Sequence, residues 1–224
     1  MKAHLKRIAM PRTWPLERKK YKFVVKGKSP HKLEFSLPLL IVLRDCIKAV
    51  HTAAEAKKVL NEKLIVLNNK VVIDPKLRAG LFDRIYIKKL EKYYTMHLKG
   101  KKLAVVEIKK EKAETKPCKI IGKTTLKGNR MQINCHDGRN FIVSEKFSVG
   151  DTIILDLKTN KIIKHLPISK GSFVLIYKGK HQGKLGKIEE IDEVKKKVTV
   201  NVENKKITLP KENVFVIEEN EYEQ

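Results

Sequence analysis

The net charge of the chain limits what it can fold into more than any other feature. Its 224 residues include 50 lysines and arginines but only 25 aspartates and glutamates, a formal net charge of +25. Such an excess of positive charge repels itself in a compact state, and a polyanionic partner neutralises it. Nucleic acid is the first candidate for that partner, and an anionic membrane surface is the second. We therefore expect several small cores beneath a surface that contacts phosphate.

The apolar segments do not favour the membrane alternative. The longest of them, residues 37–43, contains Pro38 and is far shorter than the roughly 20 residues that span a bilayer. The basic N-terminus lacks the apolar stretch of a secretion signal. Three widely spaced cysteines, an odd number, are typical of free thiols in a reducing compartment. We expect a cytoplasmic protein that has no membrane partner.

Residues 1–36 are predicted to form a basic N-terminal arm. Residues 1–32 carry eleven lysines and arginines against Glu17 alone, and three prolines and a glycine interrupt any regular period. A disordered tail would have a similar composition, but several apolar residues can dock on protein or stack on bases. These anchors are Trp14, Leu16, Tyr21, Phe23 and Val24. The candidate RNA contacts in the arm are Lys6, Arg7, Arg12, Trp14, Lys19, Lys20, His31 and Lys32, with His4 as a further histidine candidate.

Residues 37–98 are predicted to form two helices and a small hairpin. The first helix is expected to begin near Pro38 and to continue to about Val50. Thr52 and Glu55 form a capping box for the second, from Ala53 to about Asn61. Short strands at 64–67 and 71–73 are joined by asparagines that tolerate a left-handed turn.

This order of elements resembles the α-L RNA-binding module, in which the second helix and the adjacent turn lie against the RNA backbone. The module usually ends with a Gly-Asp pair, whereas here Phe82 precedes Asp83. Any one lysine of this segment could equally belong to a solvated helix face. The resemblance and the charge give as candidate RNA contacts Arg44, Lys57, Lys58, Asn68, Asn69 and Lys70.

From residue 99 onward the sequence predicts two small β units. Short β-branched segments separated by turn signals indicate a central antiparallel β domain over residues 99–171, with 109–117 as an exposed connection. Residues 172–224 repeat the β pattern around a loop in which glycines alternate with lysines, and they end in an acidic tail. Such a loop can expose backbone N–H groups beside positive charge, which lets a phosphate backbone approach closely. An ordinary barrel turn that needs positive φ has the same glycine spacing.

The string from Val174 to Ile188 closely resembles the KOW motif, which belongs to a small SH3-like β-barrel. This motif is common in ribosomal proteins and transcription elongation factors. The candidate RNA contacts in this loop are Lys178, Gly179, Lys180, His181, Gly183, Lys184, Gly186 and Lys187.

The whole chain resembles the S4e family of small-subunit ribosomal proteins, the type shared by archaea and eukaryotes. Residues 4–11 (HLKRIAMP) with Trp14, and residues 29–33 (SPHKL) leading into 37–39 (LPL), look like that family's signatures. The resemblance implies an α+β, multi-domain protein with an arm, an α-L module, a central β domain and a KOW barrel. It also implies a structural constituent of the small subunit, in single copy per ribosome, that binds and stabilises small-subunit rRNA beside neighbouring ribosomal proteins.

No catalytic or metal-binding pattern is evident. Cys135 and His136 are adjacent, so their side chains would point to opposite faces of a strand, which argues against zinc. No nucleotide-binding loop or dinucleotide fingerprint occurs. We expect no enzyme, cofactor, metal or small-molecule substrate. Two alternatives remain: a KOW-containing transcription or translation factor, and an RNA-modifying accessory protein, although the chain has little room for a catalytic domain.

Overall fold

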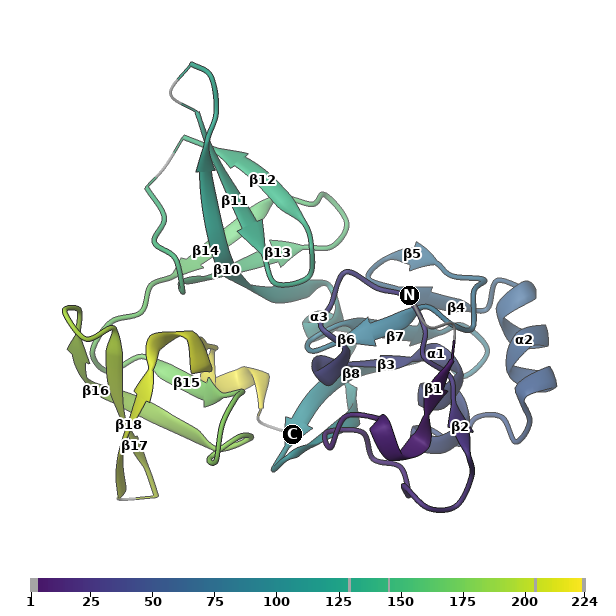
Figure 1. The fold of residues 1–224 in the computed structure, drawn as a ribbon. Coiled ribbons are helices and arrows are strands. Elements are labelled where there is room, and N and C mark those ends of the chain that lie inside the picture. The colour runs from purple at the N-terminus through teal and green to yellow at the C-terminus, as the bar shows by residue number, and fades with distance from the viewer. Residues whose placement is uncertain (1–3, 129, 145, 204, 223–224) are drawn as a thin grey trace. The chain divides into compact units, whose positions relative to one another are not determined.

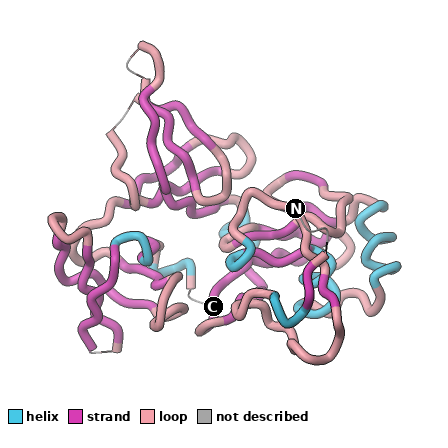
Figure 2. Tube along the Cα trace, viewed as in Figure 1, coloured by secondary structure: helices cyan, strands magenta, loops and turns pink. Residues whose placement is uncertain are grey.

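The computed structural model describes residues 4–128, 130–144, 146–203 and 205–222, and the chain divides into two compact units at residues 114 and 115 (Figure 1). Strands predominate in both units (Figure 2), so the fold is mostly β with several sheets, richer in strand than the α+β class that we predicted. Within the described ranges, no helix has the length and apolar character needed to cross a membrane. The helical segments are η1 Arg7–Ala9, η2 Leu33–Phe35, α1 Leu39–Ile41, η3 Val42–Cys46, α2 Ala53–Asn61, α3 Lys110–Ala113, η4 Lys211–Asn213 and η5 Glu219–Glu221.

The first unit is built on a five-stranded antiparallel sheet of order β5-β4-β7-β8-β9. Ile85, Met96 and Leu98 are fully buried, and Thr95 and His97, which alternate with the latter two on β8, are buried as well, so both faces of this strand are covered. Because β9 pairs with β8, a strand that we placed in the 99–171 segment belongs to this sheet. The strands are β4 Ile65–Leu67, β5 Lys70–Val71, β7 Arg84–Ile87, β8 Lys92–Lys99 and β9 Lys102–Ile108.

Two helices precede this sheet, and only the second has the predicted length. The capping box forms, since the Glu55 N–H donates to Thr52 Oγ1 at 3.1 Å and α2 begins at Ala53. The first is α1, which widens at once into the π-helical turn η3 and ends at Cys46 rather than near residue 50. Its Ile47 N–H donates to the carbonyl of Val42, five residues back, and Lys48 has a left-handed φ of 60° that stops the helix.

The N-terminal arm is an ordered part of the first unit. Trp14 is only 1% exposed, and its indole N–H donates to the Leu33 carbonyl at 3.1 Å. The Leu103 N–H of the edge strand β9 donates to the carbonyl of Thr13 at 2.7 Å. The arm is therefore fixed by both apolar burial and backbone hydrogen bonds. It contributes to two short sheets, which pair β1 Leu5–Lys6 with β2 Phe23–Val24 and β3 Ser36–Pro38 with β6 Arg78–Gly80.

The second unit begins with an antiparallel sheet of order β12-β11-β10-β13-β14. Its core contains Cys118, Ile120, Ile133, Ile153 and Leu155, which come from the three central strands. All three cysteines of the chain are free thiols. The strands are β10 Thr115–Thr125, β11 Met131–Cys135, β12 Asn140–Val143, β13 Thr152–Asp156 and β14 Ile162–Leu166.

Our prediction of an exposed connection at 109–117 is wrong at its C-terminal end. Strand β10 already pairs with β13 at Thr115, and Lys116 is fully buried. The Lys116 ammonium lies 2.8 Å from a carboxylate oxygen of Asp137, which is also buried. Burial by itself raises the pKa of Asp137, but the Lys116 ammonium overrides it and holds that pKa well below its usual range. This ion pair allows a charged segment to lie inside the unit.

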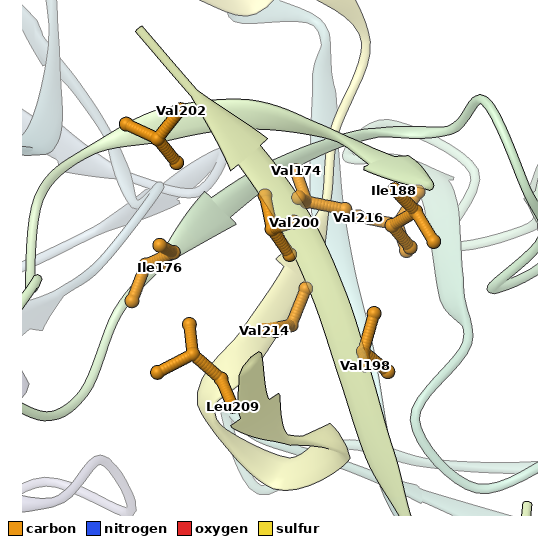
Figure 3. Close-up of a cluster of buried hydrophobic side chains, with 9 residues drawn as sticks. All are labelled: Val174, Ile176, Ile188, Val198, Val200, Val202, Leu209, Val214 and Val216. Carbon is orange, nitrogen blue, oxygen red and sulfur yellow. The ribbon is translucent and has the colours of Figure 1, made fainter. Parts of the chain in front are cut away.

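The second unit ends with another antiparallel sheet, of order β18-β17-β16-β15-β19. Figure 3 shows its core, in which nine buried aliphatic side chains from all five strands meet. Most of them are valines, whose branched Cβ restricts rotamer freedom and packs well on the surface of a sheet. The strands are β15 Phe173–Ile176, β16 Leu185–Asp192, β17 Lys197–Val202, β18 Lys205–Pro210 and β19 Val214–Val216.

Candidate nucleic-acid interface

The arm presents cations and aromatic rings together on its surface. Tyr21 is 63% exposed and Phe23 is 48% exposed. The Arg7 guanidinium lies 5.3 Å from the centroid of the Tyr21 ring, and the Lys22 ammonium lies 5.5 Å from that of Phe23. Five basic residues of the arm that we predicted to contact RNA are also exposed: Lys6, Arg12, Lys19, Lys20 and Lys32.

Three predicted RNA contacts of the arm are buried instead. Trp14 lies in the core of the first unit, where its ring cannot stack on a base. His31 is buried with its Nε2 3.2 Å from the carboxylate of Asp83, and a Cβ on Gly80 would overlap the His31 ring. Arg7 is only 8% exposed, so its contact is with Tyr21 rather than with solvent. These three side chains therefore stabilise the arm through their contacts inside the protein.

The turn between β4 and β5 has the left-handed geometry that its asparagines predicted. Asn68 has a φ of 47° and Asn69 a φ of 63°. The Asn68 side chain is used within the fold, because its amide N–H donates to Asp83 at 2.8 Å and its carbonyl accepts the Arg84 N–H at 2.9 Å. Asn68 therefore shapes the turn, whereas Asn69 and the neighbouring Lys70 are exposed at its tip.

The helical candidates lie on the same unit. Lys57 and Lys58 are exposed on α2. Arg44, in η3, is half-buried and makes a two-point contact with Asp45, with its Nη2 2.9 Å and its Nε 3.2 Å from the two carboxylate oxygens. This hydrogen-bonded contact raises the pKa of Arg44. Arg44 thus has part of its charge satisfied by Asp45.

The glycines of the loop between β15 and β16, and Gly186 at the start of β16, have structural roles in the turn and the strand pairing. Gly179 has a φ of 96° and Gly183 a φ of 84°. The Gly183 N–H donates to the Ile176 carbonyl at 2.7 Å, which closes the loop. Gly186 is buried, and a Cβ there would lie 2.3 Å from the Asn201 carbonyl oxygen. Our prediction that Gly186 contacts RNA is therefore corrected, since the strand pairing requires it, whereas Gly183 is half-buried and its contact with RNA stays a prediction.

The cations of this loop remain at its surface. Lys180 is exposed, and Lys178 and His181 are half-buried near it. Lys184 lies 3.0 Å from Glu203, and Lys187 lies 2.7 Å from Glu219. Exposed ion pairs of this kind contribute little and exchange readily, so a phosphate can replace the carboxylate.

A buried lysine that the sequence analysis missed lies within the second unit. Lys119 is 3% exposed, and its ammonium donates to the backbone carbonyls of Glu212 and Val214 while lying 4.9 Å from the centroid of the Tyr177 ring. Burial lowers the pKa of Lys119 to about 7, whereas the carbonyl acceptors favour its charged form. Lys119 therefore joins β10 to η4 and to the start of β19. A single lysine in a β pattern gives no sequence signal for such a role.

The described residues contain no group of three or more histidine, cysteine or acidic side chains placed to hold a metal ion.

Residues 90–162 match the model of ribosomal family S4e, and residues 1–34 match the RS4NT (NUC023) domain.

Known proteins resemble the chain over most of its length. It is 37% identical to "Small ribosomal subunit protein eS4" of Methanothermobacter thermautotrophicus, over 84% of this chain and 79% of that protein. The eS4 protein of Halobacterium salinarum is 35% identical, over 100% of this chain and 99% of the relative. The crystal structure of 30S ribosomal protein S4e from Thermoplasma acidophilum matches with a TM-score of 0.72 and 28% identity, over 84% of this chain and 97% of that one. The chain therefore belongs to the S4e family of ribosomal proteins.

Proposed function

We propose that the chain is a structural, non-enzymatic constituent of the small ribosomal subunit that binds and stabilises small-subunit rRNA. The observation that carries this proposal is the distribution of exposed cations over the arm, α2 with its adjacent turn, and the β15–β16 loop, in a chain of net charge +25. Cations in this number attract phosphate with little dependence on base sequence. The relatives named above support the same assignment. They give no support to a transcription factor or an RNA-modifying accessory protein.

The finer architecture belongs to the same proposal. We infer that residues 1–36 are the basic arm, 37–98 an α-L module whose sheet is extended by β9, the remainder of 99–171 a central β domain and 172–224 a KOW barrel of SH3-like type. The capped helix α2 leading to a left-handed turn supports the α-L module. The small five-stranded sheet with a glycine and lysine loop supports the KOW barrel.

The contacts that we propose are the exposed or half-buried members of the predicted set. We also propose that the chain contacts neighbouring small-subunit proteins and is present in one copy per ribosome in the cytoplasm. The proposal includes no cofactor, membrane or small-molecule substrate. The proposed contacts are Lys6, Arg12, Lys19, Lys20, Lys32, Arg44, Lys57, Lys58, Asn68, Asn69, Lys70, Lys178, Gly179, Lys180, His181, Gly183, Lys184 and Lys187.

The test replaces Lys180 and Lys184 of the β15–β16 loop and Lys187 of the adjoining strand β16 together by alanine. The affinity for a small-subunit rRNA transcript should fall, and the slope of log K against log salt should flatten by somewhat under one unit for each lost phosphate contact. Binding measured by fluorescence anisotropy at several KCl concentrations gives both quantities. Wild-type protein should also remain with small subunits through a high-salt sucrose gradient.

A matched control removes the same charge from the other end of the same sheet. Lys195, Lys196 and Lys197 are exposed at the turn between β16 and β17. Their joint replacement by alanine should leave the slope close to that of the wild type. If both triple variants changed the slope equally, the loop would have no special place in RNA binding, and the net charge alone would account for the affinity.

A further inference from the structure

Two aromatic rings on the arm are exposed without an evident benefit to the free protein. Tyr21 and Phe23 have 63% and 48% of their surface exposed, and the neighbouring Ile8 has 75%. Trp14, the single tryptophan of the chain, is buried in the same arm. The arm therefore has its own apolar anchor, and the two smaller rings are not needed to hold it in place.

A cation accompanies each of these rings. Arg7 lies over Tyr21 and Lys22 lies over Phe23, at distances typical of cation–π contacts. His4 meets the Phe23 ring edge to face, at 5.3 Å between centroids. In the β1–β2 pairing Lys6 lies opposite Phe23, which adds a further positive charge next to the ring. The rings are therefore exposed within a strongly positive environment.

This combination fits unpaired nucleobases better than it fits a protein surface. The core of a protein interface is depleted in lysine, whereas here lysines lie on and beside the rings. A single-stranded nucleotide supplies both a π face for the ring and a phosphate for the adjacent cation. Bases inside a duplex cannot offer their faces, because they are already stacked on each other.

We propose that Tyr21 and Phe23 bind unpaired bases of the RNA by stacking, with the exposed Lys6 and Lys22 holding the adjoining phosphates. This inference rests on the proposed function, since it names the part of the RNA that the arm recognises. It also separates the arm from the β15–β16 loop, whose lysines contact phosphate alone.

The test replaces each ring by leucine, because Tyr21→Leu and Phe23→Leu keep the apolar bulk and remove the π face. Each variant should bind a small-subunit rRNA transcript about 5- to 100-fold more weakly, with the salt slope unchanged. Binding to a fully paired RNA duplex should not change. Tyr21→Phe and Phe23→Tyr keep a ring and should bind like the wild type, and so should the matched control Ile8→Ala, which removes an exposed apolar side chain that has no ring.

Trp14 reports whether the arm is still folded, since its emission arises from the one indole of the chain and that indole is buried. Leucine variants that retain wild-type emission and full rRNA affinity would overturn the stacking proposal. The proposed function would still stand in that case if the triple lysine variant of the β15–β16 region showed a flattened salt slope. Loss of incorporation into subunits without loss of RNA affinity, shared by Ile8→Ala, would identify a protein contact instead. A wild-type protein that does not bind rRNA at all would remove the proposed function itself and the stacking site with it.

Discussion

His97 is a buried imidazole in the central strands of the first unit. It is 4% exposed, and its ring meets Phe82 edge to face at a centroid distance of 5.8 Å. Burial lowers the pKa of His97 to about 3, with help from the positive charges of Arg84, Lys99 and Lys112. The folded protein therefore keeps this ring neutral at pH values where the unfolded chain, with a pKa near 6.5, takes up a proton.

We predict that the free energy of unfolding decreases as the pH is lowered below about 6.5, and that His97 causes part of this decrease. Because the folded pKa is depressed, the unfolded state binds the extra proton, and the free energy of unfolding should drop by about 2 kcal/mol between pH 7 and pH 5 from this group alone. Urea unfolding of the wild type and of His97→Gln at both pH values measures the difference. Parallel losses in the two proteins would show that other groups are responsible.

Phe82 shows what the sequence could indicate at this scale and what it could not. Its burial was predictable from its size, and it is fully buried. Its φ of 63° was not predictable, because a non-glycine residue in the left-handed region costs roughly 1–2 kcal/mol. The Phe82 N–H donates to the Met96 carbonyl at 2.8 Å, and the next residue, Asp83, accepts the Gly80 N–H. Tertiary contacts thus hold Phe82 in the conformation that a Gly-Asp pair would reach without strain.

Among the elements, strand β16 depends on one glycine for its pairing with β17. A Cβ on Gly186 would come within 2.3 Å of the Asn201 carbonyl oxygen and 2.7 Å of a Val200 methyl carbon. Both obstacles belong to the neighbouring strand, and the first is backbone, so no side-chain rotation relieves the overlap. The strand must instead move away from its partner.

We predict that Gly186→Ala destabilises the second unit by about 1–3 kcal/mol or more, as overpacking in a closely packed region does. The matched control is Gly122→Ala in β10, where the nearest atom to an added Cβ is the Asn134 side-chain nitrogen at 3.7 Å and φ is not positive. Thermal unfolding of both variants gives the comparison. Equal melting temperatures for the two would mean that β16 and β17 separate at no cost.

The elements that the sequence predicted well are those whose causes are local. The capping box of α2 needs residues only three positions apart, and the asparagine turn needs only adjacent ones. The start of β10 was missed because its cause is distant: Lys116 is neutralised by Asp137, 21 positions further along the chain. The same reasoning explains the candidate site, where exposed cations followed from composition but the burial of Trp14 depended on its tertiary partner Leu33.

For the whole molecule, the net charge of +25 opposes folding and favours RNA binding, so salt should act on the two in opposite directions. The screening length falls from about 10 Å at 0.1 M salt to about 3 Å at 1 M, which weakens repulsion between exposed lysines in the free protein. We predict that the melting temperature of the free protein rises with KCl, by roughly 2 to 4 °C for each kcal/mol of repulsion removed. Over the same range the affinity for rRNA should fall, because releasing the same counterions into a more concentrated salt solution gains less entropy.

Calorimetry of the free protein and anisotropy with an rRNA transcript, both from 0.1 to about 1 M KCl, measure the two trends. The variant that lacks Lys195, Lys196 and Lys197 carries three fewer positive charges, so its melting temperature should rise less with salt than that of the wild type. A melting temperature that stays constant or falls with KCl would mean that the existing ion pairs, such as those of Lys164 with Glu218 and Lys206 with Glu189, already compensate the repulsion. The excess charge would then carry no cost in the free state, and a polyanionic partner would not be needed to explain how the chain tolerates it.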